Sequence, residues 1–170
     1  FNNITGLTSI TLSANNVEEC CQSSVNQLLY SYNVNLPRTL MIAGEKVTKL
    51  VIPNTVKSIY KEAFKGCAML NSVTIPNSVQ SIGEDAFKNT GIYNNKSNWV
   101  EDVLYIDNCL IKSLNSSKKY AIIDGTRLIA DAAFNSCTQL KSVKFPKSSL
   151  TTIGANAFNR CSFNSIKLPK

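Results

Sequence analysis

Side chains that could carry out catalysis are scarce in this 170-residue sequence. It contains no histidine, which excludes Ser-His-Asp and Cys-His arrangements and histidine-based acid–base catalysis. Glycoside hydrolysis needs two carboxylates facing each other across a cleft. The acidic pairs here are Glu84/Asp85 and Glu101/Asp102, whose adjacent side chains point in different directions, so we interpret them as solvated loop charges. The sequence therefore predicts a protein that is not an enzyme and has no catalytic residues.

Cofactor and metal sites are equally unsupported by the spacing of the residues. The seven glycines are scattered and form no phosphate-binding loop. A zinc site is disfavoured because there is no histidine and no pair of CxxC elements. Asp124-Gly125-Thr126 could offer oxygen ligands to calcium, but its residue types favour a turn. We expect no cofactor and no bound metal.

Three of the six cysteines share one position in a recurring pattern. Cys67, Cys137 and Cys161 each follow a phenylalanine by three residues. A thiol at such a repeated position behaves as a small buried hydrophobic group. Oxidation of Cys137 with Cys161 is the alternative, since neighbouring repeats could bring the two sulfurs into range.

The net charge of +7 comes from 18 Lys and Arg residues against 11 Asp and Glu residues. Nucleic-acid binding favours arginine clusters interleaved with aromatic residues. The sequence has only three arginines, and we interpret its charge as a solvated basic surface with no nucleic-acid partner. No run of 18 or more apolar residues occurs, so we expect no direct membrane insertion in this segment.

The elements that must position these residues are set by an internal repeat. Residues 50–64 are repeated at residues 73–87, and the pattern returns at residues 129–140 and 143–161. Self-similarity at a fixed period of about 20 to 50 residues indicates a solenoid or an array. The ends of the chain fall within repeats, so we expect residues 1–170 to be a single repeat domain and a segment of a longer protein.

Each repeat contains a strand followed by a proline. In Ser72–Ile75, alternation sends Val73 inward and Thr74 outward. Pro76 cannot donate to a ladder and ends the strand. Gly83 is expected to give the backbone freedom at a corner.

A second segment of each repeat contains an Ala-Phe pair at the same position. We expect Ala86-Phe87 to begin a short helical segment on the side opposite the strand. One repeat cannot bury its own phenylalanine, so neighbouring repeats must cover it. The expected result is a continuous apolar stack made of Phe64, Phe87, Phe134 and Phe158.

Two segments depart from the repeat. Residues 15–32 place apolar side chains at three- and four-residue steps, which predicts a helical variant segment. Residues 93–119 form an insertion: a polar loop anchored by Trp99 precedes a hairpin of Val103–Ile106 and Cys109–Lys112 around a two-residue turn.

The repeat resembles the BspA-type leucine-rich repeat. The resemblance is carried, in one copy, by Leu70, Val73, Ile75, Pro76, Val79, Ile82, Gly83, Ala86 and Phe87. The hairpin segment, followed by Asp124-Gly125-Thr126 and Ala132-Ala133-Phe134, is similar to the hairpin-bearing repeats of that family. Ile4 and Thr90 depart from it, because they stand where other copies have cysteine.

The resemblance implies a fold and a location. The fold would be an α/β repeat, a right-handed leucine-rich-repeat solenoid with a parallel sheet on the concave face and short helical or irregular segments on the convex face. Proteins of this family occur on the surface of host-associated bacteria and some mucosal protists, and the studied members are adhesins. We therefore expect a cell-surface or extracellular protein.

The outward strand positions are the candidate protein-binding face, because an extended solenoid surface is the usual binding surface of such architectures. The candidates are Thr11, Val51, Ser72, Thr74, Tyr105, Ser142, Lys144, Ser165 and Lys167. Lys144 and Lys167 are expected one turn apart, either as a solvated pair or as a contact for an acidic partner.

The expected partner is a protein, such as an extracellular-matrix or host surface protein, bound by a non-catalytic adhesion module. The alternative is a structural spacer that presents another domain of the parent protein. Open solenoid ends could also support self-association.

Overall fold

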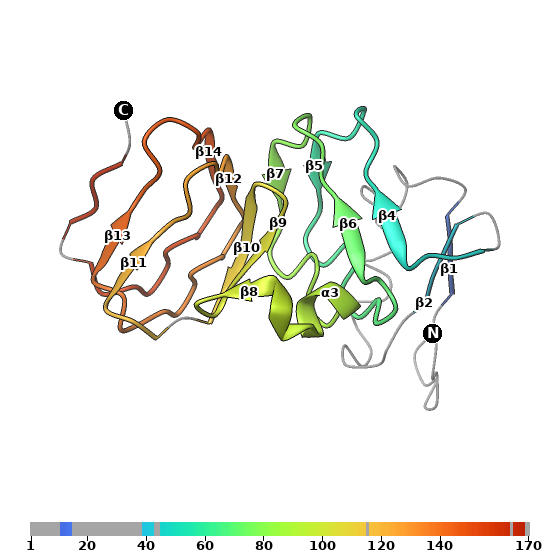
Figure 1. Cartoon of the computed structure of the whole chain (residues 1–170), viewed down its shortest axis with the longest axis horizontal. Coiled ribbons are helices and arrows are strands. Elements are labelled where there is room, and N and C mark those ends of the chain that lie inside the picture. The colour runs from blue at the N-terminus through green and yellow to red at the C-terminus, as the bar shows by residue number, and fades with distance from the viewer. Residues whose placement is uncertain (1–10, 15–38, 43–44, 115, 164, 169–170) are drawn as a thin grey trace.

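A computed structural model describes residues 11–14, 39–42, 45–114, 116–163 and 165–168. The chain winds as a parallel-strand solenoid whose successive turns lie side by side along the long axis of the molecule (Figure 1). The predicted helical segment at residues 15–32 lies outside the described residues. β1 (Thr11–Ala14) pairs in parallel with β2 (Thr39–Ile42), which pairs in antiparallel fashion with β3 (Glu45–Lys46).

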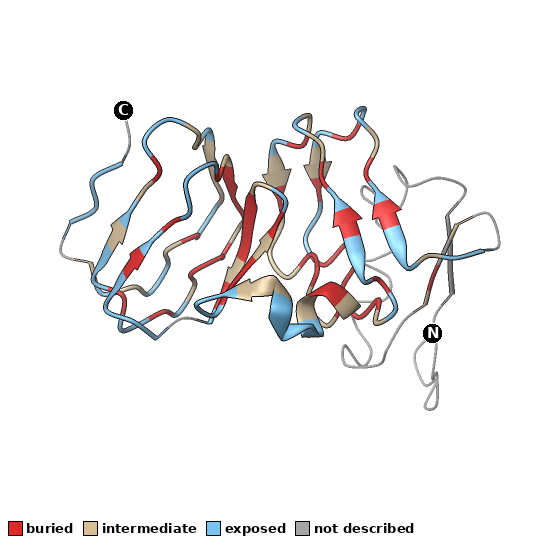
Figure 2. Ribbon diagram, viewed as in Figure 1, coloured by how far each residue is buried: buried red, intermediate tan, exposed pale blue. Residues whose placement is uncertain are grey.

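The first side of each turn is the strand that precedes the proline. β4 (Lys49–Val51) pairs in parallel with β6 (Ser72–Thr74), and β11 (Lys119–Ala121) pairs in parallel with β13 (Ser142–Lys144). The central residue points inward, which gives β4, β6 and β11 the exposed–buried–exposed pattern visible in Figure 2, while the central Val143 of β13 is half-buried. The predicted strand boundaries are confirmed, because β4 and β6 end before Pro53 and Pro76.

The second side is a shorter ladder centred on the isoleucine that precedes the glycine position. β5 (Ser58–Ile59) pairs with β7 (Ser81–Ile82), and β12 (Leu128–Ile129) pairs with β14 (Thr152–Ile153), all in parallel. Gly83 lies directly after this ladder, but backbone freedom at a corner does not explain why a glycine stands there. A Cβ there would approach the backbone nitrogen of Lys61 to 2.3 Å, so the residue is small because the preceding turn passes against it.

The third side contains the Ala-Phe pairs, and the helical expectation for it was wrong. Ala86-Phe87 lies in a turn, bounded by left-handed residues on both sides: Asp85 has φ 57° and Asn89 has φ 59°. The other turns repeat this conformation. The left-handed residues in them are Glu62, Gly66, Ala132, Ser136, Asn156 and Arg160. Alternate N–H groups bond to the next turn, as in Phe64 N to Ala86 O at 2.8 Å, and the N–H groups between them close tight turns, as in Ala63 N to Tyr60 O at 3.1 Å.

The predicted hairpin is confirmed, and it is part of a three-stranded meander. β9 (Val103–Ile106) pairs in antiparallel fashion with β10 (Cys109–Ser113), while β8 (Trp99–Val100) pairs with the other edge of β9. β10 then joins the second ladder through parallel pairing with β12. Before the meander come α3 (Gly91–Asn94) and the 3-10 helix η1 (Lys96–Asn98). Trp99 anchors this loop as predicted, because its Nε1 donates to the carbonyl of Tyr93 at 2.8 Å.

The phenylalanine stack is interrupted, which corrects the expectation of a continuous column. Phe64 stacks on Phe87 with ring centroids 5.5 Å apart, and Phe134 stacks on Phe158 at 5.0 Å. The two pairs belong to separate hydrophobic clusters. The hairpin explains the break, since its buried residues enter both clusters: Leu104 and Cys109 pack with the first, and Val103 and Leu110 with the second.

Candidate functional site

The outer face of β4 and β6 presents two exposed columns of side chains. The parallel register places Lys49 beside Ser72 and Val51 beside Thr74. All four are exposed, and Val51 leaves 68% of its surface in contact with solvent. The inward residues Leu50 and Val73 are buried, which holds the columns in place. This face therefore presents one lysine, two hydroxyl side chains and one apolar side chain on a parallel ladder.

The outer face of β11 and β13 repeats this arrangement in a more basic form. Lys119 lies beside Ser142 and Ala121 lies beside Lys144. These side chains are exposed, whereas Tyr120 between them is buried. The candidates Val51, Ser72, Thr74, Ser142 and Lys144 are thus on outward strand positions, in two separate two-stranded sheets.

Tyr105, Ser165 and Lys167 do not occupy the expected columns. Tyr105 lies on the antiparallel strand β9, and its hydroxyl pairs with that of buried Tyr120 at 3.1 Å. Ser165 and Lys167 are exposed but lie outside any strand, so Lys167 is not paired with Lys144. Thr11 lies in β1 opposite Thr39, and its side chain is outside the described part.

The structure adds Lys49, Lys119 and Ala121 to the outward positions. Sequence reasoning missed them because the repeat aligns on apolar and proline residues, and the outward positions differ from turn to turn. The available signal was the offset from the inward residue: each of these residues lies one position from Leu50 or Tyr120.

At the tip of the hairpin, a side chain takes the place of a backbone acceptor in the hydrogen-bond ladder between turns. In regular turns the N–H of the residue after the strand bonds to a backbone carbonyl of the next turn, as in Ile52 N to Thr74 O at 3.0 Å. For Ile75 the acceptor is the carboxylate of Asp107, with N to Oδ2 at 2.7 Å. The carboxylate therefore replaces the strand carbonyl that the insertion has removed.

We expect Asp107→Ala to lower the free energy of unfolding by about 1.5 kcal/mol, because the N–H of buried Ile75 loses its acceptor. Urea titration followed by circular dichroism measures this change. Asp124→Ala is the matched control, since it removes the same charge from an exposed turn residue and should cost less than about 0.5 kcal/mol. Equal losses in both variants would contradict the assigned role.

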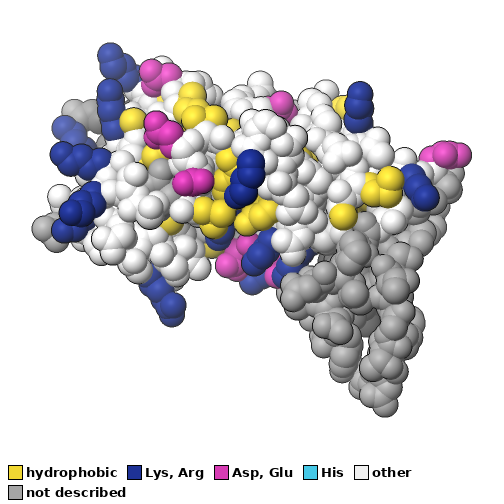
Figure 3. Space-filling model, turned by 60° about the horizontal axis from the view of Figure 1, so that its bottom comes forward, with side chains coloured by type: hydrophobic (Ala, Val, Ile, Leu, Met, Phe, Trp, Pro, Cys, Tyr) yellow, Lys and Arg dark blue, Asp and Glu magenta, His cyan; other side chains and the backbone are white. Residues whose placement is uncertain are grey.

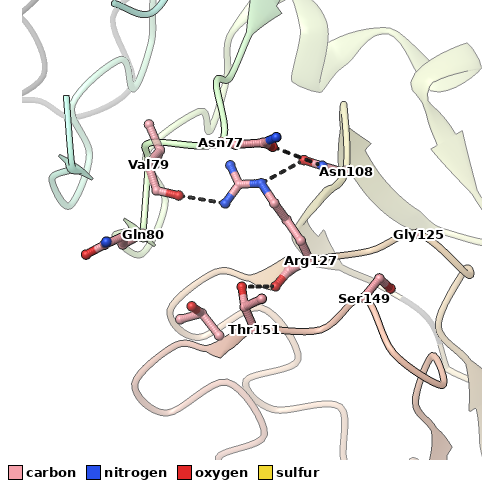
Figure 4. A pocket seen from close by; sticks show the side chains of 9 residues that line it. Asn77, Val79, Gln80, Asn108, Gly125, Arg127, Ser149 and Thr151 are labelled. Carbon is pink, nitrogen blue, oxygen red and sulfur yellow. Dashed lines mark hydrogen bonds between the residues drawn. The ribbon is translucent and has the colours of Figure 1, made fainter. Parts of the chain in front are cut away.

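Arg127 lies in a pocket of about 620 Å³ next to the hairpin tip (Figure 4). Its guanidinium donates to three oxygens on two other segments: Asn108 Oδ1 at 3.0 Å, Val79 O at 2.6 Å and Pro76 O at 2.9 Å. Its own carbonyl accepts from the Thr151 hydroxyl at 3.0 Å. The side chain thus joins the turn before the insertion to the hairpin and to the turn after it.

The chemistry of this pocket is structural rather than catalytic. The guanidinium of Arg127 donates to neutral carbonyl and amide oxygens. Its N–H groups are therefore already engaged and are not free to bind an anionic ligand. The other lining side chains include Asn77, Gln80 and Ser149, which are poor nucleophiles in the absence of a base. We therefore assign this pocket to the joint between turns.

The cysteines are in the state that their shared position predicts. Cys67 and Cys137 are buried, Cys161 is half-buried, and each of these is a thiol, so the alternative pairing of Cys137 with Cys161 is wrong. Burial raises the pKa of the Cys161 thiol to about 11, and it likewise raises the pKa of Cys109 to about 11. Both thiols stay protonated at neutral pH and are weak nucleophiles. Cys20 and Cys21 lie outside the described residues.

The described part of the chain offers neither a metal-ligand cluster nor a membrane-spanning helix. Its His, Cys, Asp and Glu side chains form no group of three or more that could hold a metal ion. None of its helices has the length and apolar character needed to cross a bilayer.

The repeated turns, with their strand, proline and Ala-Phe positions, define a leucine-rich-repeat solenoid. A family model described as "BspA type Leucine rich repeat region" matches residues 41–164 with 6 copies. The chain belongs to the BspA-type leucine-rich-repeat family. Members of such repeat families are typically non-enzymatic and act as protein-interaction or adhesion-type modules.

Among solved structures, the chain is similar to a leucine-rich cell surface protein from Faecalibacterium prausnitzii A2-165. The two are 25% identical with a TM-score of 0.36, and the match covers 80% of this chain and 46% of that one. The chain therefore spans about half the length of that protein. No curated protein matches this sequence.

Proposed function

We propose that this chain is a non-catalytic binding module of a cell-surface or secreted protein, and that it contacts a host or matrix protein through its exposed strand faces. The observation that carries the proposal is the face of β4 and β6, where Val51 is exposed within a rigid parallel ladder. Large apolar side chains fixed on such a surface provide contact area at little entropic cost. The family provides the expectation of a surface location.

The proposal is tested by binding to surfaces coated with purified extracellular-matrix proteins, with Val51→Glu/Thr74→Glu as the variant. Two buried carboxylates at the centre of a contact would weaken binding by at least about tenfold, because each loses water without gaining a partner. Surface plasmon resonance at matched protein concentrations measures the change.

The matched control is Lys57→Gln/Gln80→Glu, which lowers the net charge by the same amount at exposed positions next to the second ladder. It should bind as the wild type does. If the strand-face variant also retains full affinity, the face of β4 and β6 is not the contact.

A structural spacer is the second candidate, and the regular backbone ladders favour it. A spacer needs stiffness along its length, to which the hydrogen bonds between neighbouring turns contribute. Wild-type chain that binds none of the coated surfaces, while folding cooperatively, would support the spacer over the binding module.

A further inference from the structure

The net charge of the protein is confined to one part of the solenoid. Residues 1–102 contain 8 Lys or Arg and 8 Asp or Glu residues, whereas residues 103–170 contain 10 and 3. The excess of +7 therefore belongs to the C-terminal turns, where acidic residues are few. Figure 3 shows Lys and Arg side chains gathered at the end of the molecule that carries these turns.

Four of these basic residues lie on or directly before the paired strands β11 and β13, and we call them the lysine face. Its members are Lys118, Lys119, Lys141 and Lys144. All four are exposed. Lys119 and Lys144 are outward residues of the paired strands β11 and β13, and Lys141 donates its backbone N–H to the carbonyl of Lys118 at 2.8 Å. Neighbouring turns are about 4.8 Å apart, so these cations lie close together.

Carboxylates are outnumbered around the lysine face, because residues 103–170 hold only Asp107, Asp124 and Asp131 against 10 Lys or Arg. The ion pairs Lys61–Glu84, Lys65–Glu62 and Lys88–Asp85 all lie in the earlier turns. Asp107 accepts from Ile75 N, Asp131 accepts from Ala155 N, and the charge of Glu101 acts on Tyr120 beside Lys119. The excess of lysine still gives this face a positive potential.

We propose that the lysine face binds a linear anionic polysaccharide through its sulfate or carboxylate groups. This deepens the proposed binding function and rests on it. The cations extend over two consecutive turns on an open surface, which suits charges repeated along a chain better than one small anion in a cavity. Lysine is a compact, mobile point charge that does not require the fixed bidentate geometry of arginine. Basic clusters of this kind are a recognised physical basis for binding heparin-like polymers.

The composition around the lysine face argues against the other polyanions. Bases of a nucleic acid need exposed aromatic rings for stacking, whereas Phe145 and Phe163 are half-buried and pack on Phe158. Cores of protein–protein interfaces are depleted of lysine and enriched in Tyr, Trp and Arg. The side chains between the lysines here are Ala121 and Ser142. A polar, charged polymer fits this surface best.

The test measures binding of the wild-type chain to heparin, hyaluronate, poly-glutamate and double-stranded DNA by isothermal titration calorimetry at several salt concentrations. We expect binding to heparin, or to both polysaccharides, and weaker binding to poly-glutamate and DNA. Heparin alone would identify sulfate as the recognised group, and equal affinity for hyaluronate would identify carboxylate.

The variant Lys119→Gln/Lys141→Gln/Lys144→Gln should lower polysaccharide affinity about tenfold near 0.15 M salt and reduce the slope of log affinity against log salt by about 2 to 3. Lys46→Gln/Lys57→Gln/Lys61→Gln is the matched control, since it removes the same charge from exposed residues of the earlier turns and should change neither quantity. Far-UV circular dichroism verifies that both variants fold.

Three results would overturn the proposal: no polysaccharide binding, equal or tighter binding to poly-glutamate or DNA, or equal losses in the two triple variants. None of them would affect the matrix-protein test on Val51 and Thr74, which lie on a different sheet. Conversely, the wild type could bind no matrix protein while Val51→Glu/Thr74→Glu still binds polysaccharide. That result would contradict the protein-binding role alone.

Discussion

Phe87→Ala is expected to lower the free energy of unfolding by about 4 kcal/mol. Phe87 has no solvent-exposed surface and stacks on Phe64 with its ring plane inclined by only 14°. Truncation would remove the stacking contact with Phe64 and leave a cavity, because the flanking turns are fixed by backbone ladders and cannot collapse into it. Urea unfolding followed by circular dichroism measures the loss.

Phe163→Ala is the control for this prediction. Phe163 is half-buried and makes an edge contact with Phe158, so its truncation should cost about 1 kcal/mol. Hydrogen exchange should also show that Phe87→Ala weakens residues 50–92 more than residues 120–158, because Phe87 and Phe134 lie in different clusters. Uniform loss of protection along the chain would show that the two clusters unfold as one.

Arg127→Ala is expected to cost about 3 kcal/mol. The guanidinium bonds to Pro76 and Val79 of an earlier turn and to Asn108 of the hairpin, so its removal leaves acceptors of three residues short of a donor. Arg127→Lys should recover little, since a single ammonium cannot reach three acceptors that lie in different directions. The measurement is again the midpoint and slope of urea unfolding.

Arg160→Ala tests whether the effect comes from the joint or from the charge. Arg160 is exposed, so its loss removes the same charge without breaking a contact between turns. We expect a change of less than about 0.5 kcal/mol. A comparable loss in both variants would mean that Arg127 acts through net charge. The backbone ladders alone would then hold these turns together.

The parts of the fold that could be predicted from sequence are those in which one residue type performs one physical task in every turn. Proline after the strand, alternation within the strand and buried phenylalanine all recur, so Pro76, Val73 and Phe87 were placed correctly. The hairpin was predictable for the same reason, because its alternation and its turn are local features.

The turn conformation around Phe87 was not predictable, and the reason lies in its left-handed residues. The position that precedes Ala-Phe holds Glu62, Asp85, Ala132 and Asn156, all with positive φ and none of them glycine. Asp and Asn adopt this conformation more readily than other non-glycine residues, but Glu62 and Ala132 at the same position give no such signal. The neighbouring turn imposes the conformation, by accepting alternate N–H groups, and so the expectation of a helical segment failed.

The candidate binding face was predicted in part. Alternation from the inward residues correctly placed Val51, Thr74 and Lys144 on outward strand positions. Tyr105 was misplaced because a hairpin strand shows the same alternation as a parallel strand, and only the pairing partner distinguishes the two. Lys119 was missed because it becomes part of a face only when its register with Ser142 is known.

The unequal charge of the two ends has a consequence for how the molecule moves. β4 and β13 lie toward opposite ends of the long axis (Figure 1), so an excess of positive charge beside β13 makes the solenoid an electric dipole. Near an anionic surface such a body experiences a torque that turns its C-terminal turns forward before contact. The electric field then orients the molecule before contact, and the association rate should rise at low ionic strength. The guidance would fade as added salt shortens the Debye length to about 8 Å or less.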